Sequence, residues 1–399
     1  MFRKLSANHP LVYFFLAFIT MAGLSYINFL PGVVNALAGS IGFSDAQAGQ
    51  IVALNGYGGL FGSTVAIFLV RRIYWQSAIY TFLVVLAVTD IGTLWIETYS
   101  VMLGWRFLAG FFGGLCVGIG FSVLARLSNA DRAFGTLLLI QFSLGSLVIY
   151  LLSALETLLS AYAVFYVMAG FALLSLMMML FLPSLASERT PAKQSGLLSE
   201  LNGNAVLLML AITAFQIAAS AIWTYVGRIG LGAGISADNV SLYIAITGLL
   251  GLLGAMLPVI SGNRFGRLPW IVAGVALSSI SALLLSVSPL TPLLYATSMT
   301  LLFFSWPAVQ SYLLAVTADM DSTGRLSALA AVVSSVGLAT GPLLASGLLD
   351  NGNFSIMLYA CALVFLSCLF LLFKPVQAQE RAKADVLPSH YQPNTKDPI

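Results

Sequence analysis

Charged residues are scarce in this sequence. Only 8% of its 399 residues are Asp, Glu, Lys or Arg, and the mean hydropathy is +0.97. A typical soluble domain has about 25% charged residues, so this chain cannot cover a water-facing surface, and we expect an integral membrane protein. The net charge is only +3, and no basic patch with interleaved aromatic residues is present, which argues against nucleic-acid binding.

Histidine and cysteine are also rare. The two histidines, His9 and His390, lie near the ends of the chain, so no embedded histidine is available for a proton relay, a zinc site or a Ser-His pair. The three cysteines, Cys116, Cys361 and Cys368, lie in apolar runs without metal-ligand spacing, and we expect them to pack in the interior. We therefore expect no metal, no cofactor and no enzymatic activity. The loops and tail are also too short for the signalling domain of a membrane sensor.

Long apolar runs dominate the rest of the chain. A membrane-spanning helix needs about 20 apolar residues, whereas the strands of a membrane β-barrel are about ten residues of alternating polarity. The sequence therefore predicts an all-α polytopic membrane protein with twelve transmembrane helices. The first run is too long for a signal peptide and lacks an A-x-A-like cleavage site. The twelve predicted spans are 10–37, 47–70, 76–96, 101–125, 134–156, 159–183, 204–229, 239–261, 269–288, 293–316, 326–349 and 354–373.

Lysine and arginine in the loops predict the orientation. If the N-terminus is cytoplasmic, fifteen of the seventeen basic residues lie on the cytoplasmic side; the exceptions, Arg106 and Arg228, lie near outer helix ends. We expect a multi-pass protein of the cell membrane, the inner membrane in a bacterium, with both termini cytoplasmic.

No G-x-x-x-x-G-K-[ST] motif is present, so transport driven by ATP would need a partner chain. The expected organisation is a six-helix bundle over 1–183, a cytoplasmic linker over 184–203, a second six-helix bundle over 204–374 and a disordered cytoplasmic tail over 375–399.

The second and eighth apolar runs match at an offset of 192 residues. Each carries three glycines spaced by three, with an arginine further on. Such a stripe lets helix backbones approach closely, because packing rather than the hydrophobic effect joins helices in lipid. Two related six-helix halves are a transporter architecture with its site near the midplane between them, although any single glycine can simply fill a helix contact. The matched positions are Gly56 and Gly248, Gly59 and Gly251, Gly62 and Gly254, and Arg72 and Arg264.

Three motifs resemble those of the major facilitator superfamily, as do the twelve spans and their six-plus-six division. GNRFGRL, over 262–268, resembles the G-x-x-x-D-R-x-G-R-R loop pattern, with Asn263 in place of the acid. RFLAG, over 106–110, resembles the R-x-x-x-G signature of the fourth helix, and GLATGPLLASG, over 337–347, resembles an antiporter motif that the family carries in the fifth helix. The resemblance implies secondary transport by alternating access. It also implies a conformational or gating role for Gly262, Asn263, Arg264, Gly266, Arg267, Gly341 and Pro342.

Asp90 and Arg106 are the clearest charges inside apolar runs. Both lie eight residues from Thr98 in the connecting loop, so in a helical hairpin they reach a similar depth, about 12 Å from the turn. The two side chains could pair, or Arg106 could snorkel to the outer headgroups. Asp90 is the first candidate for proton coupling, because burial favours the protonated carboxyl and a nearby arginine favours the carboxylate.

The substrate pathway is expected to lie along the first, fourth, seventh and tenth helices, which line the cavity in the superfamily. The alternative for each polar residue on them is a hydrogen bond between helices or an anchor at the membrane interface. We expect a membrane-embedded monomer that binds a small organic solute and protons. The predicted function is proton-coupled efflux of amphipathic compounds; the alternative is uptake or exchange of an organic anion. The predicted pathway residues are Asn28, Arg106, Gln216, Trp223, Trp306 and Gln310.

Overall fold

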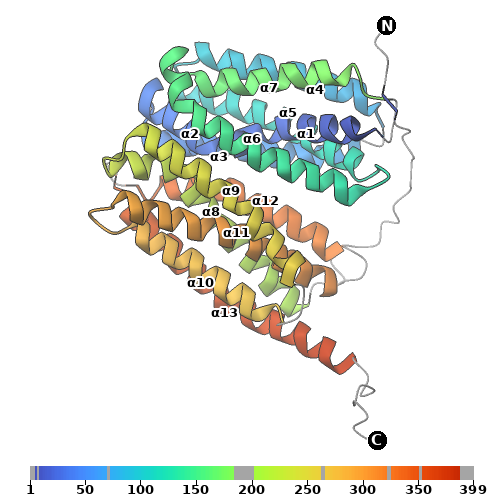
Figure 1. Ribbon diagram of the computed structural model, residues 1–399, viewed down its shortest axis with the longest axis vertical. Coiled ribbons are helices and arrows are strands. Elements are labelled where there is room, and N and C mark those ends of the chain that lie inside the picture. Colours follow the sequence, from blue (N-terminus) through green and yellow to red (C-terminus); the bar gives the residue numbers. More distant parts are fainter. Residues whose placement is uncertain are drawn as a thin grey trace, which may run out of the picture.

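The computed structural model describes residues 5–6, 9–69, 72–183, 202–261, 266–320, 325–349 and 353–386. Within these ranges the chain forms helices and no β-strand (Figure 1). Three residues of the predicted gating motif, Gly262, Asn263 and Arg264, lie outside the described residues, as does most of the predicted linker, over 184–201.

Each of the twelve predicted spans corresponds to a helical segment. Eleven helical segments are long and apolar enough to cross a membrane, and α7 is slightly shorter at 17 residues. The all-α, multi-pass architecture is therefore confirmed. The helices are α1 (Pro10–Asn28), α2 (Leu30–Asn35), η1 (Ala36–Ile41), α3 (Asp45–Leu69), α4 (Trp75–Gly92), η2 (Thr93–Trp95), α5 (Tyr99–Leu124), α6 (Ala130–Leu158), α7 (Ala163–Met179), α8 (Gly203–Gly232), α9 (Ala237–Ser261), α10 (Leu268–Leu285), α11 (Pro292–Met320), α12 (Arg325–Ser346) and α13 (Ser355–Val386).

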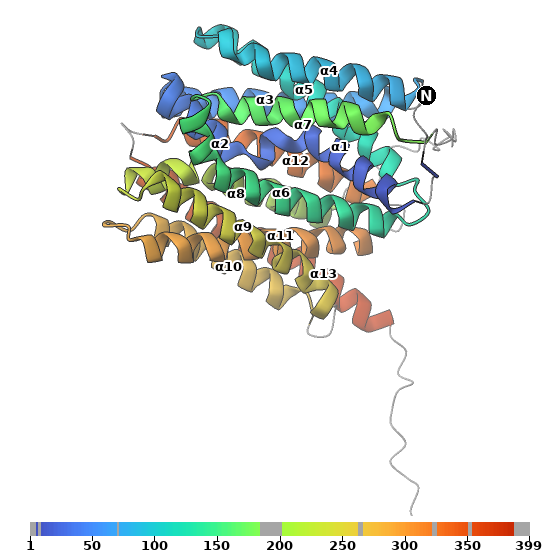
Figure 2. The ribbon, with the colours of Figure 1, turned by 45° about the horizontal axis from the view of Figure 1, so that its top comes forward.

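The helices form two groups that lie side by side. The helices from α1 to α7 occupy one half, and those from α8 to α13 occupy the other (Figure 1). In the turned view of Figure 2, α12 is seen among the helices of the first half, in agreement with its contact with α3. Among the described residues, the most extensive contacts between the halves are those of α3 with α12, α6 with α9, and α2 with α8. The start of α1 and the end of α13 lie at the same end of the molecule (Figure 1), as an even number of crossings requires.

Glycines set corresponding contacts in the two halves. A methyl group at Gly62 of α3 would collide with the Phe111 carbonyl oxygen of α5, and one at Gly254 of α9 would collide with the Phe304 carbonyl oxygen of α11. The first glycine of each triplet faces the opposite half: Gly56 faces α12 and Gly248 faces α6. The glycine stripes therefore serve the same two purposes in each half, close packing within it and contact across it.

The prediction of a disordered tail is wrong for residues 375–386, because α13 continues through Pro375 to Val386. The extension is held at the start of α10, where the Glu380 carboxylate accepts hydrogen bonds from the backbone N–H groups of Arg267 (2.6 Å) and Leu268 (2.9 Å). A carboxylate is favourable there, because the first N–H groups of a helix lack partners within the helix. The polar residues after Lys374 therefore belong to a helix end that packs on α10, not to a disordered segment.

Candidate functional site

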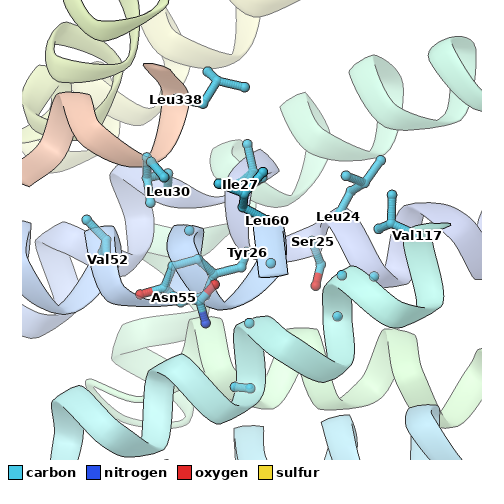
Figure 3. Close-up of a pocket in the computed structure, with 18 of the residues that line it drawn as sticks. Leu24, Ser25, Tyr26, Ile27, Leu30, Val52, Asn55, Leu60, Val117 and Leu338 are labelled. Carbon is cyan, nitrogen blue, oxygen red and sulfur yellow. The ribbon is translucent and has the colours of Figure 1, made fainter. Parts of the chain in front are cut away.

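Two adjoining cavities lie in the central region of the molecule, and both take lining residues from the two halves. The Arg106 cavity has a volume of about 140 Å³ and is lined mainly by α1, α3 and α5, with Trp223 and Leu338 from the other half. Figure 3 shows Leu338 on α12 across this cavity from Tyr26 and Asn55 of the first half. The Gln216 cavity has a volume of about 280 Å³ and is lined by α1, α6, α8, α9, α11 and α12.

Asp90 and Arg106 form an ion pair at the wall of the Arg106 cavity. The distance from Arg106 Nη1 to Asp90 Oδ1 is 2.9 Å, and the same nitrogen donates to Thr93 Oγ1 at 3.1 Å. Each charged residue is only 1% exposed, so Arg106 does not snorkel to a surface. The depth argument from the sequence therefore led to the correct partner. Removing either charge alone would leave the other buried and uncompensated.

Aromatic rings and a helix contact hold Arg106 in place. Its guanidinium carbon lies 4.6 Å from the ring centre of Tyr26 and 5.2 Å from that of Phe165, so the cation faces two aromatic rings. The Asn55 side chain donates to the Arg106 carbonyl oxygen at 2.8 Å, which ties α3 to α5. The arginine is thus fixed by its own half of the molecule.

An uncharged hydrogen-bond network lies at the wall of the Gln216 cavity. Gln216 Nε2 donates to Ser334 Oγ at 2.6 Å, and Trp306 Nε1 donates to Gln216 Oε1 at 2.6 Å. Gln310 Nε2 donates to the same serine oxygen at 3.1 Å. The network joins α8, α11 and α12. Two buried amide atoms at this cavity, Asn28 Nδ2 and Gln310 Oε1, have no hydrogen-bond partner among the described residues.

The glycine motif of α12 brings this network together. A methyl group at Gly341 would collide with the Ile217 carbonyl oxygen of α8, and one at Gly337 would press on Gln216 and Thr213. Because both glycines let α12 approach α8, Ser334 comes within hydrogen-bonding distance of Gln216. Pro342 lines the Arg106 cavity. Gly341 packs against Ser220, which also lines that cavity. A gating role for Gly341 and Pro342 remains a prediction.

The two described residues of the predicted loop motif lie far along the helices from these cavities. Gly266 has a positive φ of 74°, a conformation that glycine adopts readily. Arg267 Nη1 lies 2.5 Å from Asp319 Oδ2, joining the start of α10 to the end of α11. This contact lies within the second half, and the gating role of Gly266 and Arg267 likewise remains a prediction.

Polar contacts join the halves near the start of α3 and the end of α8. Arg228 Nε lies 2.6 Å from Asp45 Oδ1, and the Tyr225 hydroxyl donates to the Asp45 carbonyl oxygen at 3.0 Å. Ser153 of α6 donates to Asp238 of α9 at 2.6 Å. Arg228, which the sequence placed near an outer helix end, is therefore ion-paired across the halves, and with cytoplasmic termini these contacts lie toward the outer side.

A proline explains one further contact between the halves. Pro31 has no N–H, so it cannot donate to the Ile27 carbonyl oxygen four residues earlier. That oxygen accepts a hydrogen bond from Trp223 Nε1 at 3.0 Å. The break in the first span, between α1 and α2, thus supplies an acceptor for the opposite half.

The structure brings the six predicted pathway residues to these two cavities. Arg106 lines the Arg106 cavity, and Trp223 lines both. Sequence reasoning missed Ser334, Thr93 and Asp45, because single polar residues of these types gave no signal of their partners. No group of three or more metal-ligating side chains occurs among the described residues. The residues at the Gln216 cavity are Asn28, Gln216, Trp223, Trp306 and Gln310.

Comparison with known proteins identifies the relatives of this chain. The sequence profile of the Major Facilitator Superfamily matches residues 13–304 and 208–393. No curated protein matches the sequence significantly. Among solved structures, a mutant of the nucleoside transporter NupG is similar with a TM-score of 0.74 and 15% identity, over 93% of this chain and 98% of that chain.

Two further solved transporters share the fold. A D-xylose–proton symporter has a TM-score of 0.72 and 17% identity, over 90% of this chain and 97% of that chain. A bacterial homolog of the human lysosomal transporter Spinster, in an inward-facing and unoccupied conformation, has a TM-score of 0.68 and 13% identity, over 94% and 98%. At such low identities, these likenesses show the fold alone.

Proposed function

The chain belongs to the major facilitator superfamily, and from this premise we propose that it is a proton-coupled secondary transporter that moves a small organic solute by alternating access. The observation that carries the coupling is the buried Asp90–Arg106 ion pair at a cavity wall between the halves. Among the described residues, Asp90 is the carboxylate lining this cavity, so it is the acid that can exchange a proton with the transport route.

The physical basis of coupling is the charge balance of a buried ion pair. Protonation of Asp90 would leave Arg106 as an uncompensated buried cation, which is costly. The protonated state would therefore favour a rearrangement that hydrates Arg106 or gives it another partner. If the halves rock around the cavity, Asp90 would take up its proton on one side of the membrane and release it on the other.

The cavity walls support an amphipathic solute more than an organic anion. Most lining side chains are apolar, with amides and indoles among them. The anion alternative needs a free cation, whereas the charge of Arg106 is compensated by Asp90. An amphipathic compound that enters the bilayer unaided would be exported, whereas a solute with many hydrogen-bond donors does not enter unaided and could be carried in either direction. The nucleoside transporter and the xylose–proton symporter of the same fold support the general class of small-solute transport.

The positive charges in the loops support cytoplasmic termini, and the chain is proposed to act as a monomer in the cell membrane. In that orientation, the ion pair between Arg228 and Asp45 joins the halves toward the outer side, and we propose that a solute enters from the cytoplasm.

Everted membrane vesicles test this function. With an acidic interior, vesicles that contain the protein are expected to accumulate at least one of three probes: uridine, ethidium or benzoate. Asp90→Asn should abolish the pH-driven accumulation. The matched control is Glu97→Gln, an exposed carboxylate in the loop after η2, which should retain it. Accumulation that persists in Asp90→Asn and still depends on the pH gradient would contradict the coupling role.

A further inference from the structure

We propose that the Gln216 cavity binds an uncharged ring compound with an apolar face and N–H or O–H donors, recognised by Gln310, Asn28 and carbonyl groups that prolines release. The inference rests on the proposed transport function and adds the class of solute. Nucleosides and monosaccharides both have these features, and the experiment below distinguishes between them.

Charge is the first ground for this class. The described lining of the Gln216 cavity contains no Asp, Glu, Lys or Arg. A charged solute would therefore enter a site without a counter-ion, and burying an unpaired charge is far more costly than burying a hydrogen-bonded polar group. The adjoining charges of Asp90 and Arg106 already neutralise each other.

Two unpaired amide atoms are the second ground. Both amide atoms of Gln216 are occupied, one by Trp306 and the other by Ser334. Gln310 is different, because its nitrogen donates to Ser334 while its oxygen is buried without a partner among the described residues. Asn28 Nδ2 is a buried donor that likewise has no hydrogen-bond partner among the described residues. Buried polar groups are normally hydrogen-bonded. A ligand that donates to the Gln310 oxygen and accepts from the Asn28 nitrogen would satisfy both atoms.

Two prolines leave backbone carbonyl groups of cavity-lining residues without their usual helix donor. Pro307 cannot donate to the Phe303 carbonyl oxygen, and Pro342 cannot donate to the Leu338 carbonyl oxygen, each four residues earlier. Phe303 and Leu338 both line the Gln216 cavity. The proposal assigns these carbonyl groups, together with the Gln310 oxygen, as acceptors for the donors of the solute.

The indoles supply flat apolar surface. Trp223 and Trp306 have already used their N–H groups, on the Ile27 carbonyl oxygen and the Gln216 oxygen. They therefore offer their faces and edges to a ligand. Phe303 meets Trp223 edge to face at 5.1 Å and extends this surface. The cavity volume of about 280 Å³ equals roughly nine waters at about 30 Å³ each, which suits a small ring compound.

Thermal unfolding of the purified full-length protein tests the class directly. A compound that binds the folded state raises its stability by mass action. Uridine, adenosine or D-xylose should raise the Tm, and the pattern among them separates nucleosides from sugars. Uridine monophosphate, benzoate and tetraphenylphosphonium should not. A chain that none of the neutral compounds stabilises, or that a charged probe stabilises more strongly, contradicts the proposal.

Matched variants tie the binding to this cavity. Gln310→Met keeps the side-chain length and removes both amide atoms, so the affinity for the neutral probe should fall about tenfold, as expected for lost hydrogen bonds. Gln76→Met changes a glutamine that donates to the Pro183 carbonyl oxygen outside both cavities, and should leave the affinity unchanged. Equal affinities in the two variants would overturn the site assignment. If a charged compound proves to be the solute and the pH gradient still drives it, this inference fails while the proposed function stands.

Discussion

The two halves of the molecule use the same helix packing but place different chemistry at the centre. In the first half, the cavity wall carries the ion pair of Asp90 and Arg106. At the repeat offset of 192 residues, the corresponding residues of the second half are Ala282 and Ser298, which carry no charge. The second half instead contributes the amide network around Gln216.

This difference separates two requirements of a coupled transporter. A proton site needs an ionisable group whose charged form is stabilised to different degrees in different conformations, and a charged group is costly within the membrane. A site for an uncharged solute needs many weak polar contacts and no net charge. The proton site lies in the first half, whereas the solute site lies between the halves and takes its amide network from the second. The following variants are designed to break or sharpen that separation.

Removing one partner of the ion pair should have the largest effect on stability. Arg106→Ala leaves Asp90 buried and unpaired, and the free energy of unfolding should fall by about 3–5 kcal/mol. Arg126→Ala, at an exposed arginine bonded to Ser122, should change little. Replacing both partners, with Asp90→Leu and Arg106→Met, should restore much of the stability but not the coupling. Denaturant titration in detergent measures all three, and a stable Arg106→Ala protein would contradict the role of the pair.

Glycine substitutions should affect the two halves alike. A methyl group at Gly62 or Gly254 meets a carbonyl oxygen of the neighbouring helix, and overpacking of this kind costs about 1–3 kcal/mol. Gly104→Ala, where nothing lies within 4 Å of the added carbon, is the control. Thermal unfolding should show similar losses for the first two variants. A large loss at only one of them would mean that the halves are not packed in the same way.

The ion pair between the halves should have the smallest effect on stability. The side chains of Arg228 and Asp45 are 25% and 16% exposed, and pairs open to solvent contribute about 0–1 kcal/mol. Asp45→Asn should nevertheless move the equilibrium toward states in which the halves separate near this pair. Spin labels at Glu97 and Asn239, exposed residues of opposite halves, would report longer distances. An unchanged distance distribution would remove the pair from the closing contacts.

The sequence predicted the membrane-spanning helices well because the length of an apolar run is a local signal. The equal spacing of Asp90 and Arg106 from one turn was sufficient to place them at one depth, since a hairpin of straight helices preserves that geometry. The partners Ser334 and Asp45 could not be predicted, because their contacts depend on which helices pack across the halves. Residues 375–386 were predicted to be disordered for a related reason. The sequence shows that Glu380 is polar, but not that its carboxylate accepts hydrogen bonds from the first N–H groups of α10.

The most direct test of the separation compares Asp90→Asn with Gln310→Met in the same proteoliposomes, using whichever neutral probe stabilises the protein. Two rates are measured, uptake driven by a pH gradient and exchange of labelled for unlabelled probe without a gradient. The account predicts that Asp90→Asn loses the driven uptake but keeps exchange, whereas Gln310→Met weakens the apparent affinity in both and still responds to the gradient. If Asp90→Asn loses exchange and uptake to the same degree, or if Gln310→Met loses only the response to pH, the separation of the proton site from the solute site is contradicted.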